Sequence, residues 1–298
     1  MTWLRSYLFA PGNNEKLVAR VFGAGADAVV LDLEDAVPQD EKARARKLVA
    51  SALSGRPAAS VSGAPHRPAV YVRINGLESG EWRDDVNAAV APGVLGIRVP
   101  KAESLEMFCR LNDAIAERER VVGLNPGSLA VVATIESARG LAGIEEIARA
   151  PRVCGFTFGS SDYCAEIGAD ASDETATLFA RSQLVMVSRH HRLRPPVASV
   201  FTRLDDEDGL LADTTRQRSL GFFGRSAVHP RQVQVIHRIS SPTGDDARAA
   251  RDIVAAYEAS AARGAGALQT GGAFVDAAVV RRARLTIERF EEWGGEGR

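Results

Sequence analysis

VVATIES (131–137) is one of four short apolar runs in this chain that carry a charged residue at or beside their ends. The other three are VYVRIN (70–75), IRVPKAE (97–103) and FTFGSSD (156–162), and the four charged residues are Arg73, Lys101, Glu136 and Asp162. Each run is short and largely β-branched or aromatic, as buried strands of a parallel sheet are. Because parallel strands end at one common rim, these four side chains are expected to lie together.

Eight such runs alternate with helical patterns, at residues 6–11, 28–34, 69–74, 93–99, 129–135, 153–159, 196–202 and 221–228. This alternation predicts an α/β fold, a (β/α)₈ TIM barrel over residues 1–239. The stretch GRPAASVSGAPHRP (55–68) is predicted to be a loop because glycine and proline interrupt both patterns. Residues 240–298 are predicted to form a C-terminal helical extension that acts as a lid or an oligomerisation arm.

The composition is that of a globular enzyme rather than of a nucleic-acid-binding or membrane protein. The 298 residues are 45% hydrophobic and 25% charged, with a formal net charge of -1 and a pI of about 6.6. Neither a basic surface for nucleic acid nor an apolar run of about 18 residues for a membrane span is present. The N-terminal sequence does not resemble a secretory signal, and the three cysteines lack zinc-ligand spacing, so a reducing cytoplasm is expected.

Glu136 and Asp162 are the candidate metal ligands. Each follows a predicted strand, and one βα unit separates them. Two carboxylates at strand ends can bind Mg²⁺ while leaving positions for water and substrate oxygens, and no histidine or cysteine accompanies them to favour a softer metal. Both could instead be surface carboxylates or helix caps, and for Asp162 alone this is as plausible as metal binding, but the pair together favours the metal.

Each basic residue at the rim could either contact substrate or form a structural ion pair. The planar fork of Arg73 matches a substrate carboxylate, although it could instead form a structural ion pair with a loop acid. Lys101 could contact substrate or pair with Glu34 or Asp35, and the structural role is slightly favoured. Asp32 lies in the same acidic cluster, LDLEDAV (31–37), whose carboxylates would repel one another unless cations or hydrogen bonds compensate.

The chain resembles the citrate lyase beta-chain and malyl-CoA lyase group of the HpcH/HpaI aldolase family. The motifs that carry the resemblance occur in the order RSYLFAPGNNEK (5–16), ADAVVLDLEDAV (26–37), VRING (72–76), VPKAES (99–104), ATIESARGL (133–141), FGSSDY (158–163), GRSAVHPRQV (224–233) and GGAFVDAA (271–278). The resemblance implies a (β/α)₈ barrel, a Mg²⁺ ion held by Glu136 and Asp162, and Arg73 on a substrate carboxylate.

The resemblance also implies a CoA site and a proton-transfer residue. CoA would bind with Arg5 and Lys16 near its phosphates and with Pro230 nearby. Asp276 would be the acidic residue of the C-terminal lid that moves a proton as acid or base, often offered to a neighbouring subunit of a homotrimer. Two departures stand out: Arg225 replaces the lysine of many members, and alanines follow Asp276 where a proline is usual.

These residues predict a Mg²⁺-dependent carbon–carbon lyase. It would cleave a 3-hydroxyacyl-CoA thioester of the citramalyl-CoA or malyl-CoA type into acetyl-CoA and an α-oxo acid. Two alternatives stay open: a malate-synthase-like or malyl-CoA thioesterase activity, and a citrate lyase beta subunit that acts on a carrier-bound citryl group.

Overall fold

The computed structural model describes residues 3–54, 67–171, 173–262, 267–270 and 273–293. The chain divides into two compact units, one of residues 4–236 and the other of residues 237–298 with the start of the chain. Most of the loop predicted at 55–68 lies outside the described residues. Within the described part, none of the helices combines the length and the apolar character needed to cross a membrane.

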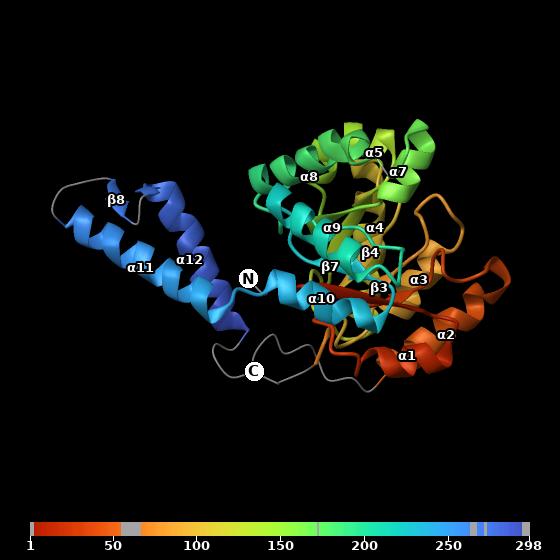
Figure 1. The fold of residues 1–298 in the computed structure, drawn as a ribbon. Helices are drawn as coiled ribbons and strands as arrows, with labels where there is room; N and C mark the ends of the chain where they lie inside the picture. Colours follow the sequence, from red (N-terminus) through yellow and green to blue (C-terminus); the bar gives the residue numbers. More distant parts are fainter. Residues whose placement is uncertain (1–2, 55–66, 172, 263–266, 271–272, 294–298) are drawn as a thin grey trace. The chain divides into compact units, whose positions relative to one another are not determined.

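The larger unit is built around a parallel sheet of seven strands in the order β6-β5-β4-β3-β2-β1-β7, as far as the described residues show. The strands are β1 (Ser6–Pro11), β2 (Ala28–Asp32), β3 (Ala69–Arg73), β4 (Gly96–Val99), β5 (Ala130–Ile135), β6 (Val153–Phe158) and β7 (Arg225–Ala227). The helices between and after them (Figure 1) are α1 (Glu15–Val21), α2 (Lys42–Leu53), α3 (Trp82–Ala89), α4 (Leu105–Val121), α5 (Ala138–Ala142), α6 (Ile144–Ile147), α7 (Ser160–Ile167), α8 (Leu178–His190), α9 (Glu207–Leu220) and α10 (Pro230–Ser240), with 3-10 turns at Gln39–Glu41 and Glu174–Thr177.

The prediction of a closed (β/α)₈ TIM barrel is wrong, because the sheet is an open half-barrel of seven strands. The run at 196–202 forms no strand and contributes only two isolated bridges, Val197 with Thr157 and Ala198 with Arg225. Two prolines, Pro195 and Pro196, begin this segment. Proline has no N–H to donate, so Pro196 only accepts, from the N–H of Phe223, and donation to the sheet within this run begins at Val197, which leaves too short a ladder for a strand.

The register of the sheet brings charged residues of neighbouring strands side by side. Pro11 of β1 lies opposite Asp32 of β2, Asp32 lies opposite Arg73 of β3, and Arg73 lies opposite Arg98 of β4. Paired residues of in-register parallel strands point to the same face of the sheet. Asp32, Arg73 and Arg98 therefore form one row of charged side chains, which we call the charged rung.

A buried ion pair connects two elements at the N-terminal ends of the strands. Glu119 of α4 is fully buried, and its carboxylate is 2.8 Å from Nη2 of Arg152, the residue that precedes β6. The same carboxylate accepts backbone N–H bonds from Gly127 and Leu129. The carboxylate of Glu119 thus binds Arg152 and two backbone N–H groups at once, and these contacts fix α4 against β5 and β6.

The smaller unit is a pair of helices with a short hairpin. It contains α11 (Gly244–Ala261), β8 (Leu268–Thr270), β9 (Ala273–Val275) and α12 (Ala277–Glu292), and α11 packs along α12 (Figure 1). A capping box between Thr243 and Asp246 starts α11. Trp3 joins this unit through hydrogen bonds to Glu288 and Glu292 of α12.

We predict that Glu119→Gln lowers the free energy of unfolding by about 3 kcal/mol, since it leaves Arg152 buried without its charge partner. Burial acts to raise the pKa of Glu119, but the hydrogen bonds from Arg152, Leu129 and Gly127 outweigh it and hold the pKa below its usual value. The stabilisation is therefore present above the unfolded-state pKa of about 4.3 and is lost as the pH falls through the lower folded value.

Urea unfolding at neutral and acidic pH measures this effect. Glu117→Gln on the exposed side of the same helix is the matched control and should change stability by less than about 0.5 kcal/mol. A difference between wild type and Glu119→Gln that stays constant as the pH falls to 3 would contradict the pKa assignment.

Candidate active site

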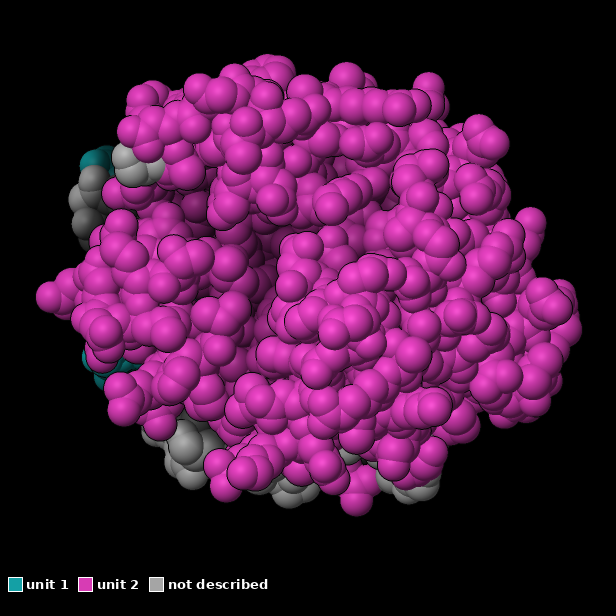
Figure 2. Space-filling model, turned by 90° about the vertical axis from the view of Figure 1, so that its right-hand side faces the viewer, with its two compact units in different colours: residues 1–3, 237–298 teal, residues 4–236 magenta. Residues whose placement is uncertain are grey.

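The two predicted metal ligands face the same cavity. Glu136 directly follows β5, and Asp162 lies in the first turn of α7, directly after β6. Both line a cavity of about 580 Å³ at the C-terminal ends of the strands. The face of this unit that is turned to the viewer in Figure 2 is deeply hollowed.

Glu136 is held in place by its neighbours. It is 7% exposed, and its Oε1 accepts a hydrogen bond of 2.7 Å from the backbone N–H of Lys101. Lys101 adopts a left-handed backbone conformation (φ 49°), which is uncommon for a residue with a side chain and directs this N–H toward the carboxylate. Burial raises the pKa of Glu136 to about 8, and the negative charges of Glu34 and Asp162 act in the same direction. A cation beside Glu136 would offset all three of these effects.

Gly159 lies against Glu136 from the other side. A Cβ atom built on Gly159 would overlap both the Cβ and the carboxylate of Glu136. Because two such atoms cannot occupy the same space, only glycine at this position lets β6 and α7 approach the end of β5 so closely. This close approach is what puts Asp162 in the same cavity as Glu136.

Arg73 lies in the cavity wall and is already ion-paired. Its Nε and Nη2 donate to the two oxygens of Asp32, both at 2.6 Å, which is a bidentate pair. Its Nη1 is 2.8 Å from Glu34 and 3.5 Å from Asp35. The ion pair that the sequence left open for Arg73 is thus present, and the partners are the acidic cluster after β2.

Glu34 and Lys101 meet beside this group. Glu34 is buried, and its Oε1 lies 3.7 Å from Nζ of Lys101. Burial raises the pKa of Glu34 to about 7, with Asp35 and Asp32 adding to the rise and Arg73 and Lys101 opposing it. Lys101 therefore pairs with Glu34, one of the two partners that the sequence suggested.

The residues expected near CoA lie at two different places. Lys16 is exposed on α1, after the C-terminal end of β1, and Pro230 begins α10, after the C-terminal end of β7. Arg5 directly precedes β1, so it lies at the other end of the parallel strands, where it is 2.8 Å from Asp27. The fold brings Lys16 and Pro230 to the end of the sheet that carries Glu136, and it does not bring Arg5 there.

Asp276 belongs to the smaller unit. It is the N-cap of α12 and accepts hydrogen bonds from the N–H groups of Ala278 and Val279. These hydrogen bonds lower the pKa of Asp276, so the residue is a carboxylate at neutral pH.

Sequence reasoning missed Arg98. It lies in the middle of an apolar run and was not singled out, yet it is fully buried in β4 and lines the same cavity as Glu136. A charged residue inside an otherwise apolar strand was the available signal, because such a residue is rarely buried without a reason.

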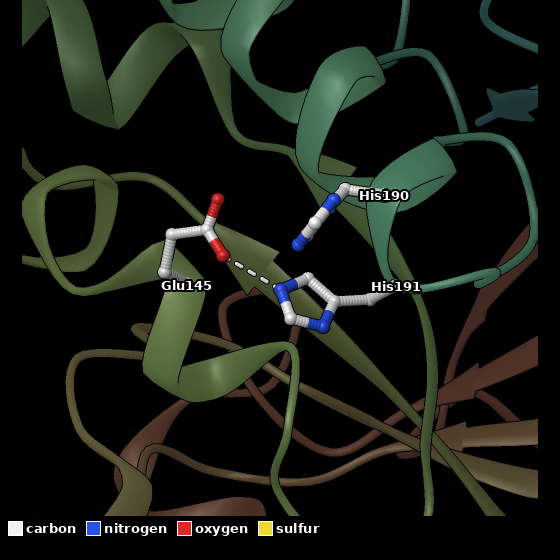
Figure 3. A group of neighbouring side chains, drawn as sticks. All are labelled: Glu145, His190 and His191. Atoms are coloured by element: carbon white, nitrogen blue, oxygen red, sulfur yellow. Dashed lines mark hydrogen bonds and ion pairs between the residues drawn. The ribbon is translucent and has the colours of Figure 1, made fainter.

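A second group of potential ligands lies elsewhere, between α6 and the end of α8. Glu145, His190 and His191 point toward one another, with possible ligand atoms all within 4.8 Å (Figure 3). Nε2 of His191 is 2.6 Å from the carboxylate of Glu145. Imidazoles favour transition metals over Mg²⁺, and none of the three residues lines the cavity of Glu136. This cluster is a hydrogen-bonded pair, Glu145 and His191, with the exposed His190 beside it.

The cavity itself offers oxygen ligands for a hard cation. Among the described residues, its charged lining consists of two arginines and four acids, namely Arg73, Arg98, Asp32, Asp35, Glu136 and Asp162. Acids therefore outnumber bases, and no histidine or cysteine of the described chain lines it. Such a set suits Mg²⁺ and would repel an anionic substrate unless a cation were also bound.

Comparisons with known proteins agree with this arrangement. A family model described as HpcH/HpaI aldolase/citrate lyase matches residues 5–230. The chain is 33% identical to citrate lyase subunit beta of Haemophilus influenzae, over 96% of each protein. It is 31% identical to an L-malyl-CoA/beta-methylmalyl-CoA lyase and 30% identical to a (3S)-malyl-CoA thioesterase, both of Cereibacter sphaeroides, over 96% of this chain and 94% of each relative.

A solved structure is similar as well. The citrate lyase beta subunit of Mycobacterium tuberculosis, complexed with oxaloacetate and magnesium, is 25% identical with a TM-score of 0.66, covering 81% of this chain and 98% of that one. The motifs, the family model and the relatives agree, and the chain belongs to the HpcH/HpaI aldolase/citrate lyase family, as a lyase of its citrate lyase beta-like group.

Proposed function

We propose that this protein is a Mg²⁺-dependent carbon–carbon lyase that cleaves a 3-hydroxyacyl-CoA thioester into acetyl-CoA and an α-oxo acid. Citramalyl-CoA and malyl-CoA are the first candidate substrates. The observation that carries the proposal is the shared cavity of Glu136 and Asp162, whose acids outnumber its bases. The names of the malyl-CoA lyase and of the magnesium-bound citrate lyase beta subunit support the same chemistry.

Glu136 and Asp162 would hold the metal ion. Both offer carboxylate oxygens, and the raised pKa of Glu136 is typical of a buried acid that a cation would stabilise in its charged form. When bound, Mg²⁺ would stabilise negative charge on the oxygens of the oxo-acid fragment. Lys101 orients Glu136 through its backbone N–H, so the ligand geometry does not depend on the lysine side chain.

The remaining roles are proposals that extend from the family resemblance. Arg73, held by Asp32, would orient the substrate carboxylate, and Lys16 and Pro230 would contact CoA, whereas Arg5, paired with Asp27 at the opposite end of the sheet, would not. Asp276 would transfer the proton. Its lowered pKa keeps it a carboxylate, which would take the proton from the substrate hydroxyl as the carbon–carbon bond breaks and then give that proton to the acetyl-CoA enolate.

Asp276 would reach the cavity on the C-terminal segment. We propose that residues 1–239 form the catalytic unit and residues 240–298 a helical lid or oligomerisation arm, and that the protein is a homotrimer in which this segment serves a neighbouring subunit. Closure of the segment would exclude water from the reacting thioester. The thiols of Cys109, Cys154 and Cys164 form no disulfide, which fits the proposed cytoplasmic location.

Two other activities have support among the relatives. The (3S)-malyl-CoA thioesterase favours hydrolysis of the malyl-CoA thioester, as in a malate-synthase-like reaction, and the citrate lyase subunit favours action on a carrier-bound citryl group. A panel of 3-hydroxyacyl-CoA esters with Mg²⁺ separates the three, scored for acetyl-CoA, free CoA and oxo acid. A lyase releases acetyl-CoA and oxo acid, a thioesterase releases free CoA, and a carrier-dependent subunit is inactive on every CoA ester.

We predict that Glu136→Gln and Asp162→Asn each abolish Mg²⁺-dependent cleavage, because each removes one carboxylate ligand. Activity is measured in chelator-treated buffer with Mg²⁺ added back, and Glu117→Gln on the exposed face of α4 is the control. Full turnover by either variant without added metal would remove the metal assignment.

We predict that Gly159→Ala lowers the affinity for Mg²⁺ at least about tenfold, because the new methyl group displaces Glu136 from its position. Calorimetric titration with Mg²⁺ measures the change. Gly80→Ala is the matched control, since a Cβ atom there meets nothing within 4 Å. Equal Mg²⁺ affinity in the two variants would show that the close approach of Gly159 does not position the ligand.

A further inference from the structure

The guanidinium of Arg98 is buried in the wall of the cavity without an acidic partner. Arg98 is 1% exposed. Its Nη1 donates to the hydroxyl of Ser226 at 3.2 Å and its Nη2 donates to the hydroxyl of Thr157, while Nε has no hydrogen-bond partner. Within the described chain, no carboxylate forms an ion pair with it. A buried cation in this position is costly unless something else supplies the missing negative charge.

The charged rung explains why the acid is missing. Arg73 stands between Asp32 and Arg98 in the register of the sheet, and both of its Asp32 contacts lie on the side away from Arg98. The order across the three strands is negative, positive, positive. Two guanidinium groups on adjacent strands repel each other, so a second negative charge beside Arg98 would stabilise the row.

Arg98 remains charged at neutral pH despite its burial. Burial lowers its pKa to about 10, and the nearby charge of Arg73 acts in the same direction. The faces of Tyr7 and Phe9 lie 5.2 and 5.3 Å from the guanidinium carbon and provide some compensation. They leave the Nε donor unpaired, and they supply no net negative charge.

We propose that Arg98 forms a carboxylate subsite in the cavity, so that the α-oxo acid fragment of the substrate carries a second carboxylate. This inference rests on the proposed lyase function. Glu136 and Asp162 would hold the cation that compensates the charge at the oxo end of the fragment, and Arg98 binds the distal carboxylate. The preferred fragment is then a dicarboxylic 2-oxo acid, so a citryl-type thioester is preferred over malyl-CoA and citramalyl-CoA, whose oxo-acid fragments carry one carboxylate each.

Oxaloacetate and pyruvate, which differ by one carboxylate, are the probes. With saturating Mg²⁺ and the full-length chain, calorimetry should show oxaloacetate binding at least about tenfold more tightly than pyruvate. Arg98→Gln should weaken oxaloacetate binding about ten- to a hundredfold and pyruvate binding less than about threefold, since one charge-assisted contact is lost. Arg110→Gln, the same change on the exposed face of α4, should alter neither.

Ser226→Asp tests the same subsite without removing the buried arginine. It places a carboxylate beside Nη1 of Arg98, so it should raise the melting temperature and abolish the preference for oxaloacetate. This variant decides the matter if Arg98→Gln does not fold. A preference for oxaloacetate that survives in Ser226→Asp, or an equal loss of both ligands in a folded Arg98→Gln, overturns the subsite.

The wild-type protein separates failure of the subsite from failure of the proposed function. If wild type binds both oxo acids with Mg²⁺ and does not distinguish them, the lyase proposal stands and the Arg98 subsite is wrong. If wild type binds neither probe with Mg²⁺, the lyase proposal itself fails, and the subsite fails with it.

Discussion

The in-register parallel pairing of β2, β3 and β4 is the constraint on which the rest of the site depends. It aligns Asp32, Arg73 and Arg98 on one face, at the end of the sheet where the cavity lies. A shift of one residue in any of these strands would turn its charged side chain to the opposite face. The buried ion pair of Asp32 with Arg73 can therefore form only in this register, and the same register positions the other charged groups of these strands in the cavity wall.

Charged side chains are paired differently at the two ends of the sheet. At the N-terminal ends of the strands, Arg5 pairs with Asp27 and Arg152 pairs with Glu119, each cation with its own carboxylate. At the C-terminal ends, carboxylates crowd together with raised pKa values and one guanidinium has no acid. Such a division is expected when one end of a parallel α/β sheet stabilises the fold and the other carries function.

The sequence predicted the end of the sheet at which the site would form, because charge at the end of an apolar run can be read without a structure. Seven of the eight predicted runs contain a strand, and Glu136 and Asp162 line one cavity. The run at 196–202 was misjudged because its apolar residues look like a strand, while Pro195 and Pro196 withhold the N–H groups that pairing needs. Arg98 was overlooked because strand register, which places it beside Arg73, is a property of pairing between distant segments.

Several features around Glu136 are unfavourable to the folded chain on its own. Lys101 has a left-handed backbone, Glu136 is buried near other negative charges, and Gly159 has no side chain to pack. Strain of this kind persists only where the surrounding structure holds it, and it is concentrated here around one carboxylate. Carboxylates that are already fixed in place do not have to be ordered when the cation binds. The stability that the folded protein loses by holding them there therefore increases its affinity for the cation. The same reasoning applies to Arg98, whose charge without an acidic partner costs stability and would strengthen the binding of an anion.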